Sequence, residues 1–138
     1  MTAKEIADFL RAQVPTFQDI EVLSTGRAFH YTPHADRIEA FGRFLGAPLT
    51  VNIDRTQDRP ESPQATSDPG VVFAYAALSD AVEEGFNTEI FEISYQSAVR
   101  ATHSQEAELG APPTILISSS EISECRRLGR AEELGDQS

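Results

Sequence analysis

The sequence predicts a small single-domain α+β protein with a mixed, mainly antiparallel sheet and two or three flanking helices. Two observations carry this prediction. The chain has 138 residues, 40% of them hydrophobic and 24% charged, which suits one ordinary globular core. Helical and strand patterns follow one another without the strict alternation that a parallel α/β sheet needs. We expect the domain to span residues 1–128 and a polar, frayed tail to span residues 129–138.

A helix is predicted at the start of the chain. Thr2-Ala3-Lys4-Glu5 has the form of a capping box, in which the threonine and the glutamate side chains satisfy each other's backbone N–H groups. Pro15 is expected to end the helix. Apolar residues then recur at intervals of three and four, which indicates one buried face: Ile6, Phe9, Leu10 and Val14.

The next part of the chain predicts short strands around a second helix. Residues 20–23 and 27–31 have strand character, and Ser24-Thr25-Gly26 is expected to separate them. Ile38, Phe41 and Leu45 give a helix its apolar face, and a strand follows over residues 49–53. Residues 54–69 form a proline-rich loop, and loops of that length are usually lids, binding loops or disordered segments.

The second half of the chain predicts most of the remaining sheet. Residues 70–75 and 114–117 are expected to be buried strands, and a short helix over residues 78–82 is expected to end at Gly85. Residues 89–95 alternate cleanly, with the aromatic face towards the core. That face consists of Phe91, Ile93 and Tyr95. A last strand or turn is anchored by two further residues, Ile122 and Leu128.

Charge and composition exclude several classes of function. The formal net charge of −11 disfavours nonspecific nucleic-acid binding and attraction to an anionic membrane surface. Cys125 is the only cysteine, so no disulfide can form within the chain. The first 15 residues lack an apolar run, and no stretch approaches the roughly 18 apolar residues of a membrane span. We therefore expect a cytoplasmic protein.

The most informative candidate for chemistry is the run His30-Tyr31-Thr32 at the end of a predicted strand. An imidazole at a strand end can hold a ribose hydroxyl, and the hydroxyl or backbone of Thr32 can fix a carboxamide. The structural alternative is that Phe29 and Tyr31 are core residues and His30 simply occupies the polar face.

Phe29-His30-Tyr31-Thr32, followed by Ile38 and Gly42, resembles the opening of the ADP-ribosyltransferase superfamily. In that superfamily an aromatic-His-Gly/Tyr-Thr strand precedes a helix with an isoleucine and a later glycine. Gly70-Val71-Val72-Phe73 with residues 77–81 resembles the family's second strand and helix.

The resemblance extends to the end of the predicted sheet. Glu108, preceded by Glu106 and followed by the strand at residues 114–117, is similar to the family's catalytic glutamate region. Glu121-Ile122 fits the closing pattern. The similarity spans roughly residues 28–122. Solvated charges on a turn are the structural alternative for the two glutamates.

The resemblance implies a transferase that uses NAD as substrate to modify a macromolecular target, a protein. Glu108 would be the catalytic carboxylate, because glycosidic bond cleavage passes through an oxocarbenium-like state with developing positive charge. Phe73 or Tyr75 would stack on nicotinamide, and His30, Tyr31 and Thr32 would complete the cofactor-binding patch. The pyrophosphate would meet one of three arginines, Arg27, Arg37 or Arg43.

A different class of function also fits the composition: a non-enzymatic acidic binding or accessory protein of the phage or mobile-element type. Its acidic surface would meet a basic partner, with an attraction that weakens in salt. A metal site at His30 and His34 is not expected, because Pro33 interrupts a helix between them. The enzymatic interpretation requires His30, an aromatic ring of residues 73–75 and Glu108 to line one cleft.

Overall fold

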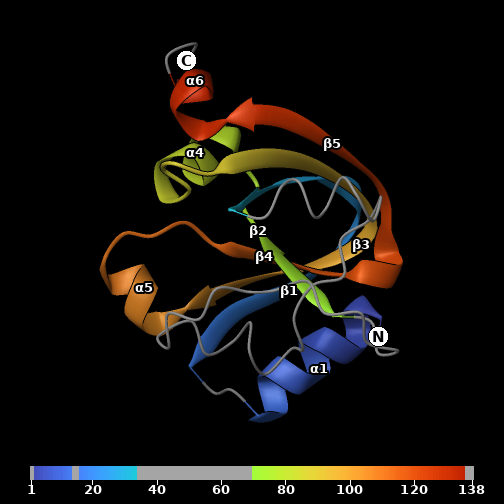
Figure 1. Ribbon diagram of the computed structural model, residues 1–138. Helices are drawn as coiled ribbons and strands as arrows, with labels where there is room; N and C mark the ends of the chain where they lie inside the picture. Colours follow the sequence, from blue (N-terminus) through green and yellow to red (C-terminus); the bar gives the residue numbers. More distant parts are fainter. Residues whose placement is uncertain (1, 14–15, 34–69, 136–138) are drawn as a thin grey trace.

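The computed structural model describes residues 2–13, 16–33 and 70–135, which form an α+β fold with a mainly antiparallel sheet (Figure 1). The expected helix around Ile38, the strand at residues 49–53 and the loop at residues 54–69 lie outside the described residues. The helices are α1 (Ala3–Gln13), α4 (Leu78–Glu84), α5 (Ser104–Glu108) and α6 (Ala131–Gly135), with a short 3₁₀ helix, η2 (Ser119–Glu121). The strands are β1 (Phe17–Thr32), β2 (Val71–Ala74), β3 (Glu89–His103), β4 (Thr114–Ser118) and β5 (Ile122–Arg130).

The long strand β3 organises the sheet. It pairs with β1 along its whole length, from Phe17 opposite His103 to Thr32 opposite Glu89. Its other edge is shared by β4 and β5, and β2 extends the sheet beyond β4. Tyr75, just after β2, exchanges two backbone hydrogen bonds with Phe29 of β1 at 2.7 and 2.8 Å. The sheet therefore curls so that the segment after β2, at one end of the strand order, pairs with β1 at the other end.

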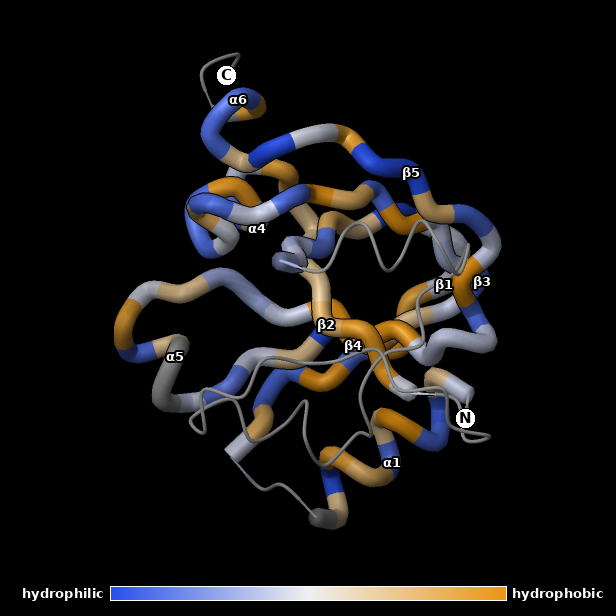
Figure 2. Tube along the Cα trace, viewed as in Figure 1, coloured by the Kyte–Doolittle hydropathy of each residue, from blue (hydrophilic) through white to orange (hydrophobic). Residues whose placement is uncertain are grey.

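The capping box at the start of α1 is confirmed. The backbone N–H of Thr2 donates to Oε1 of Glu5, and the N–H of Glu5 donates to Oγ1 of Thr2, both at 3.2 Å. The apolar face of α1 packs against one face of the sheet (Figure 2). Its buried residues are Ala3, Ile6, Ala7 and Leu10.

The central strands are buried on both faces. Val71 and Phe73 of β2 belong to the core cluster that α1, α4 and α6 cover, whereas Val72 and Ala74 belong to a second cluster on the opposite face. The second cluster also contains Phe91, Ile93 and Tyr95, so the face of β3 expected to point inward is confirmed. Burial on both faces explains why β2 and β4 are continuous apolar runs.

One expectation about β1 was wrong: residues 20–31 form a single strand without a turn at Gly26. Gly26 lies directly opposite Tyr95 of β3, and a Cβ atom on Gly26 would lie 2.7 Å from the Tyr95 hydroxyl. The glycine therefore makes room for an aromatic ring on the neighbouring strand. A local sequence pattern cannot distinguish this use of glycine from a turn.

Residues 129–135 of the expected polar tail are not frayed in the structure. Gly129 and Arg130 continue β5, and α6 follows directly. Ala131 is fully buried, its N–H donates to the carbonyl of Thr88 at 2.9 Å, and Leu134 packs on the same core. Two apolar residues three positions apart are enough to dock this short helix on the core.

Candidate functional site: an aromatic cluster and an ionic network

Four of the predicted site residues lie together because the end of β1 pairs with the end of β2. The rings of His30 and Tyr31 stack with centroids 6.3 Å apart, and the rings of Tyr31 and Tyr75 stack at the same separation. Phe73 meets Tyr75 edge to face, with centroids 5.1 Å apart. A fifth predicted residue, Thr32, follows in the same strand and is 5% exposed.

His30 is held as a neutral donor within this cluster. Its Nδ1–H group donates a hydrogen bond to the carbonyl oxygen of Phe73 on β2. Burial lowers the pKa of His30 from 6.5 to about 4, although the hydrogen bond to Phe73 acts in the opposite direction. At neutral pH the imidazole is therefore uncharged, with its proton on Nδ1 by virtue of this hydrogen bond.

The protein itself packs against the aromatic rings. Phe73 and Tyr75 are only 7% and 3% exposed, and both belong to the core cluster under α1. Gly85, at the end of α4, lies so close to Tyr31 that an added Cβ would be 2.3 Å from the Cβ of that tyrosine. Neither Phe73 nor Tyr75 therefore presents the open ring face that stacking on nicotinamide would need.

Glu108 lies on a different element, the exposed end of α5. That helix follows His103, at the end of β3 opposite Phe17, whereas His30 lies opposite Phe91 near the start of β3. Within the described residues, no hydrogen bond or ion pair joins Glu108 to the aromatic cluster. The structure thus brings together His30, Tyr31, Thr32, Phe73 and Tyr75, and Glu108 is not among them.

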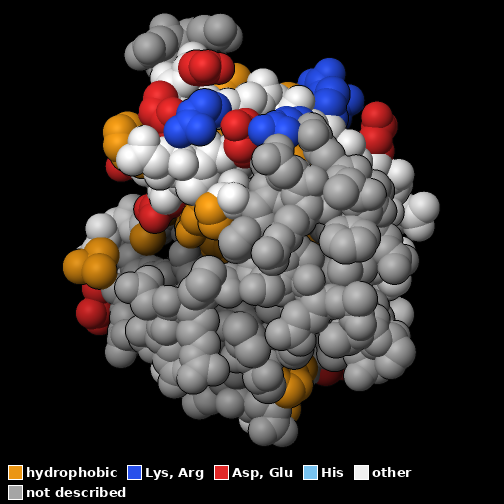
Figure 3. Space-filling view, in the orientation of Figure 1, with side chains coloured by type: hydrophobic (Ala, Val, Ile, Leu, Met, Phe, Trp, Pro, Cys, Tyr) orange, Lys and Arg blue, Asp and Glu red, His pale blue; other side chains and the backbone are white. Residues whose placement is uncertain are grey.

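A second polar feature, which the sequence analysis missed, lies where β5 meets α6. Figure 3 shows arginine and acidic side chains interspersed over this part of the surface. The guanidinium group of Arg127 reaches both carboxylate oxygens of the half-buried Glu89, at 3.1 and 3.4 Å. Arg126 pairs with Glu92 at 3.5 Å. The sequence places the two glutamates in one strand and the arginines in another, and only the register of β3 with β5 shows that they pair.

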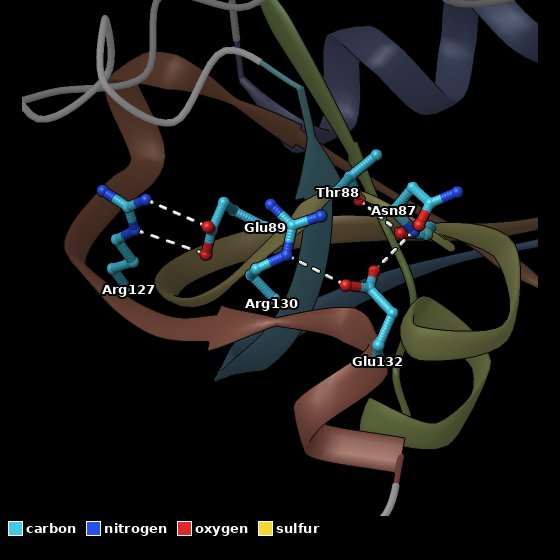
Figure 4. Close-up of polar contacts among 7 residues, drawn as sticks. Asn87, Thr88, Glu89, Arg127, Arg130 and Glu132 are labelled. Atoms are coloured by element: carbon cyan, nitrogen blue, oxygen red, sulfur yellow. Dashed lines mark hydrogen bonds and ion pairs between the residues drawn. The ribbon is translucent and has the colours of Figure 1, made fainter.

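This network continues to the turn between α4 and β3 (Figure 4). Nε of Arg130 lies 2.9 Å from Oε2 of Glu132, and Oε1 of Glu132 accepts the backbone N–H of Asn87 at 2.6 Å. The hydrogen bond from Arg130 holds the pKa of Glu132 below its ordinary value. Glu132 therefore links the start of α6 to the turn that contains Asn87.

The described residues hold no group of three potential metal ligands close enough to bind one ion. His30 and His103 lie near opposite ends of β3, and His34 lies outside the described residues. None of the described helices combines the length and the apolar character that crossing a bilayer requires.

No protein-family model matches the chain, and no curated protein or solved structure is significantly similar to it. The resemblance to ADP-ribosyltransferases therefore stays a prediction.

Proposed function

We propose that this protein acts by binding a basic protein partner, without catalysis. The observation that carries the proposal is a group of carboxylates on α4 and α6 that makes no hydrogen bond or ion pair with the rest of the described residues. Glu132 forms an ion pair with Arg130, and its neighbouring carboxylates on these two helices form none with the described residues. They are Asp80, Glu83, Glu84 and Glu133.

Two of these carboxylates occupy positions that cost local stability. Glu83 and Glu84 lie in the last turn of α4, which contains no basic residue. The carbonyl end of a helix carries partial negative charge, so a carboxylate there is disfavoured by about 0.3 to 1 kcal/mol. Carboxylates at the carbonyl end of a helix, with no nearby basic residue to offset them, are unfavourable for stability. Such unfavourable placements are expected at functional surfaces. The net charge of −11 adds long-range attraction to a basic partner.

The proposal predicts salt-dependent binding to a cationic probe. A fluorescently labelled amphipathic peptide of leucine and lysine should bind the full chain, and the affinity should fall steeply as salt is raised, because screening weakens the attraction. A matched peptide of leucine and glutamate is the control and should not bind. Fluorescence anisotropy measures both. Binding of the lysine peptide that does not change with salt would contradict the proposal.

A second candidate function is NAD-dependent ADP-ribosyl transfer. One observation favours it, the adjacency of His30, Tyr31 and Tyr75, and the separate position of Glu108 on α5 counts against it. If Glu108 stabilises positive charge on the ribose, Glu108→Gln should lower NAD cleavage by about 10²-fold or more. Glu124→Gln, on the exposed part of β5, is the control and should leave cleavage unchanged. Incubation with labelled NAD measures hydrolysis and label transfer. No binding, no hydrolysis and no transfer by the parent chain would exclude this function.

A further inference from the structure

We propose that Phe86 is the apolar anchor of the acidic surface on α4 and α6, and that the partner presents an apolar pocket rimmed by lysine or arginine. This inference rests on the proposed function and specifies the chemistry of its partner. It starts from exposure: the Phe86 side chain is 67% exposed, whereas the rings of Phe73, Tyr75 and Phe91 are buried. Burial of a phenylalanine ring is favourable, and Phe86 does not obtain this stabilisation within the described fold.

Phe86 is displayed on a turn whose backbone is fixed on both sides. Before it, the N–H of Gly85 donates to the carbonyl of Ala81 at 2.8 Å. After it, the N–H and the hydroxyl of Thr88 both donate to the carbonyl of Gly85, at 2.9 and 2.5 Å. Asn87 has a φ of 67° and donates its N–H to Glu132. A turn held by these bonds loses little conformational entropy when a partner covers it.

The turn is also fastened to the body of the sheet. Gly85 lies directly against Tyr31 of β1, so the chain entering the turn cannot shift away from the strand without opening this contact. Glu132 ties Asn87 to α6, and Arg130 holds Glu132 in place (Figure 4). The ionic network found beside β5 thus has a positioning role for the segment that carries Phe86.

The surroundings of Phe86 specify the partner by charge. The carboxylates of Glu83 and Glu84 precede the turn in the same helix, and Glu133 lies on α6, the helix that Glu132 joins to the turn. An aromatic residue surrounded by a polar rim is the usual anatomy of an interface hot spot. These negatively charged carboxylates around Phe86 would repel a second copy of the chain, a nucleic acid or an anionic membrane. A protein with lysine or arginine around an apolar pocket is complementary to both the ring and its rim.

The test compares Phe86→Ser with Leu109→Ser. Leu109 is 87% exposed on a different part of the surface, just after α5, and is therefore a matched control for general apolar contact. In anisotropy titrations with the leucine and lysine peptide, Phe86→Ser should weaken binding by about tenfold or more, as expected for a hot-spot residue. Leu109→Ser should bind as the parent does. Equal affinities for both variants would overturn the inference.

A second readout uses the absence of tryptophan from the sequence. Phe86→Trp introduces a single fluorophore at the proposed anchor, and Leu109→Trp introduces one at the control position. Addition of the peptide should shift the emission of the first to shorter wavelength and leave the second unchanged. If the peptide binds in a salt-dependent manner but both tryptophans respond alike, this inference fails and the proposed function stands. If the parent shows no salt-dependent binding, the proposed function itself fails.

Discussion

Replacing Gly85 by alanine is expected to destabilise the fold by about 3 kcal/mol, because the added methyl group has no room. The new Cβ would lie 2.3 Å from the Cβ of Tyr31, 2.7 Å from its Cγ and 2.8 Å from the carbonyl oxygen of Ala81. None of these atoms is the mobile end of a side chain. Tyr31 is fixed in the paired part of β1, opposite Ile90, and Ala81 is a buried residue of α4. Relief of the overlap therefore requires α4 to move away from the sheet.

Chemical denaturation of the parent and of Gly85→Ala measures this loss. Gly110→Ala is the matched control, because a Cβ on Gly110 meets no atom within 4 Å. Gly110 has a φ of 78°, so this control should lose only about 1 kcal/mol from backbone strain. A Gly85→Ala variant as stable as the control would mean that α4 adjusts freely on β1. The fixed position assigned to Phe86 would then lose its support.

The elements that could be predicted from the sequence are those specified by local patterns. The capping box fixed the start of α1, and Gly85 marked the end of α4. The apolar runs that became β2 and β4 were recognised because each is short, continuous and bounded by residues that favour turns. The inward face of β3 followed from strict alternation of polar and apolar residues.

The features that could not be predicted depend on contacts between distant segments. Gly26 has the appearance of a turn residue until Tyr95 is placed opposite it on β3. The closure of the sheet depends on the pairing of Phe29 with Tyr75, which no local pattern specifies. The position of Phe86 is equally nonlocal, because Glu132 fixes the turn from 45 residues further along the chain.

The candidate site shows the same division. The resemblance predicts one binding site formed by residues 30–32 together with Phe73 and Tyr75. Strand pairing does bring these residues together. Spacing along the sequence carried no information about burial, so it could not show that these rings pack into the core. It also could not show that Glu108 follows the opposite end of β3. The geometry therefore favours a structural role for the cluster.

A structural role for His30 predicts that the protein loses stability on mild acidification. The pKa of His30 is about 4 in the folded state, against 6.5 when unperturbed. A group with a lowered folded pKa contributes stability that is fully present above its unfolded pKa and is lost as the pH falls towards the folded pKa. Below about pH 6.5 the unfolded chain binds a proton that the folded chain excludes. The free energy of unfolding should therefore fall by about 2 kcal/mol between about pH 7 and about pH 5 from this residue alone.

His30→Asn separates this effect from the titration of carboxylates, since the asparagine amide nitrogen takes the position of Nδ1 and can donate to the carbonyl of Phe73 but cannot bind a proton. Between about pH 7 and about pH 5, the free energy of unfolding of this variant should fall by about 2 kcal/mol less than that of the parent. Denaturant titrations at each pH measure the difference, and the imidazole resonances in NMR spectra should give a midpoint for His30 near pH 4. Parallel pH profiles for the two proteins, or an NMR midpoint near the unperturbed value, would mean that the imidazole is hydrated. A hydrated imidazole would be accessible to a ligand, so that result would return the cluster to consideration as a binding site.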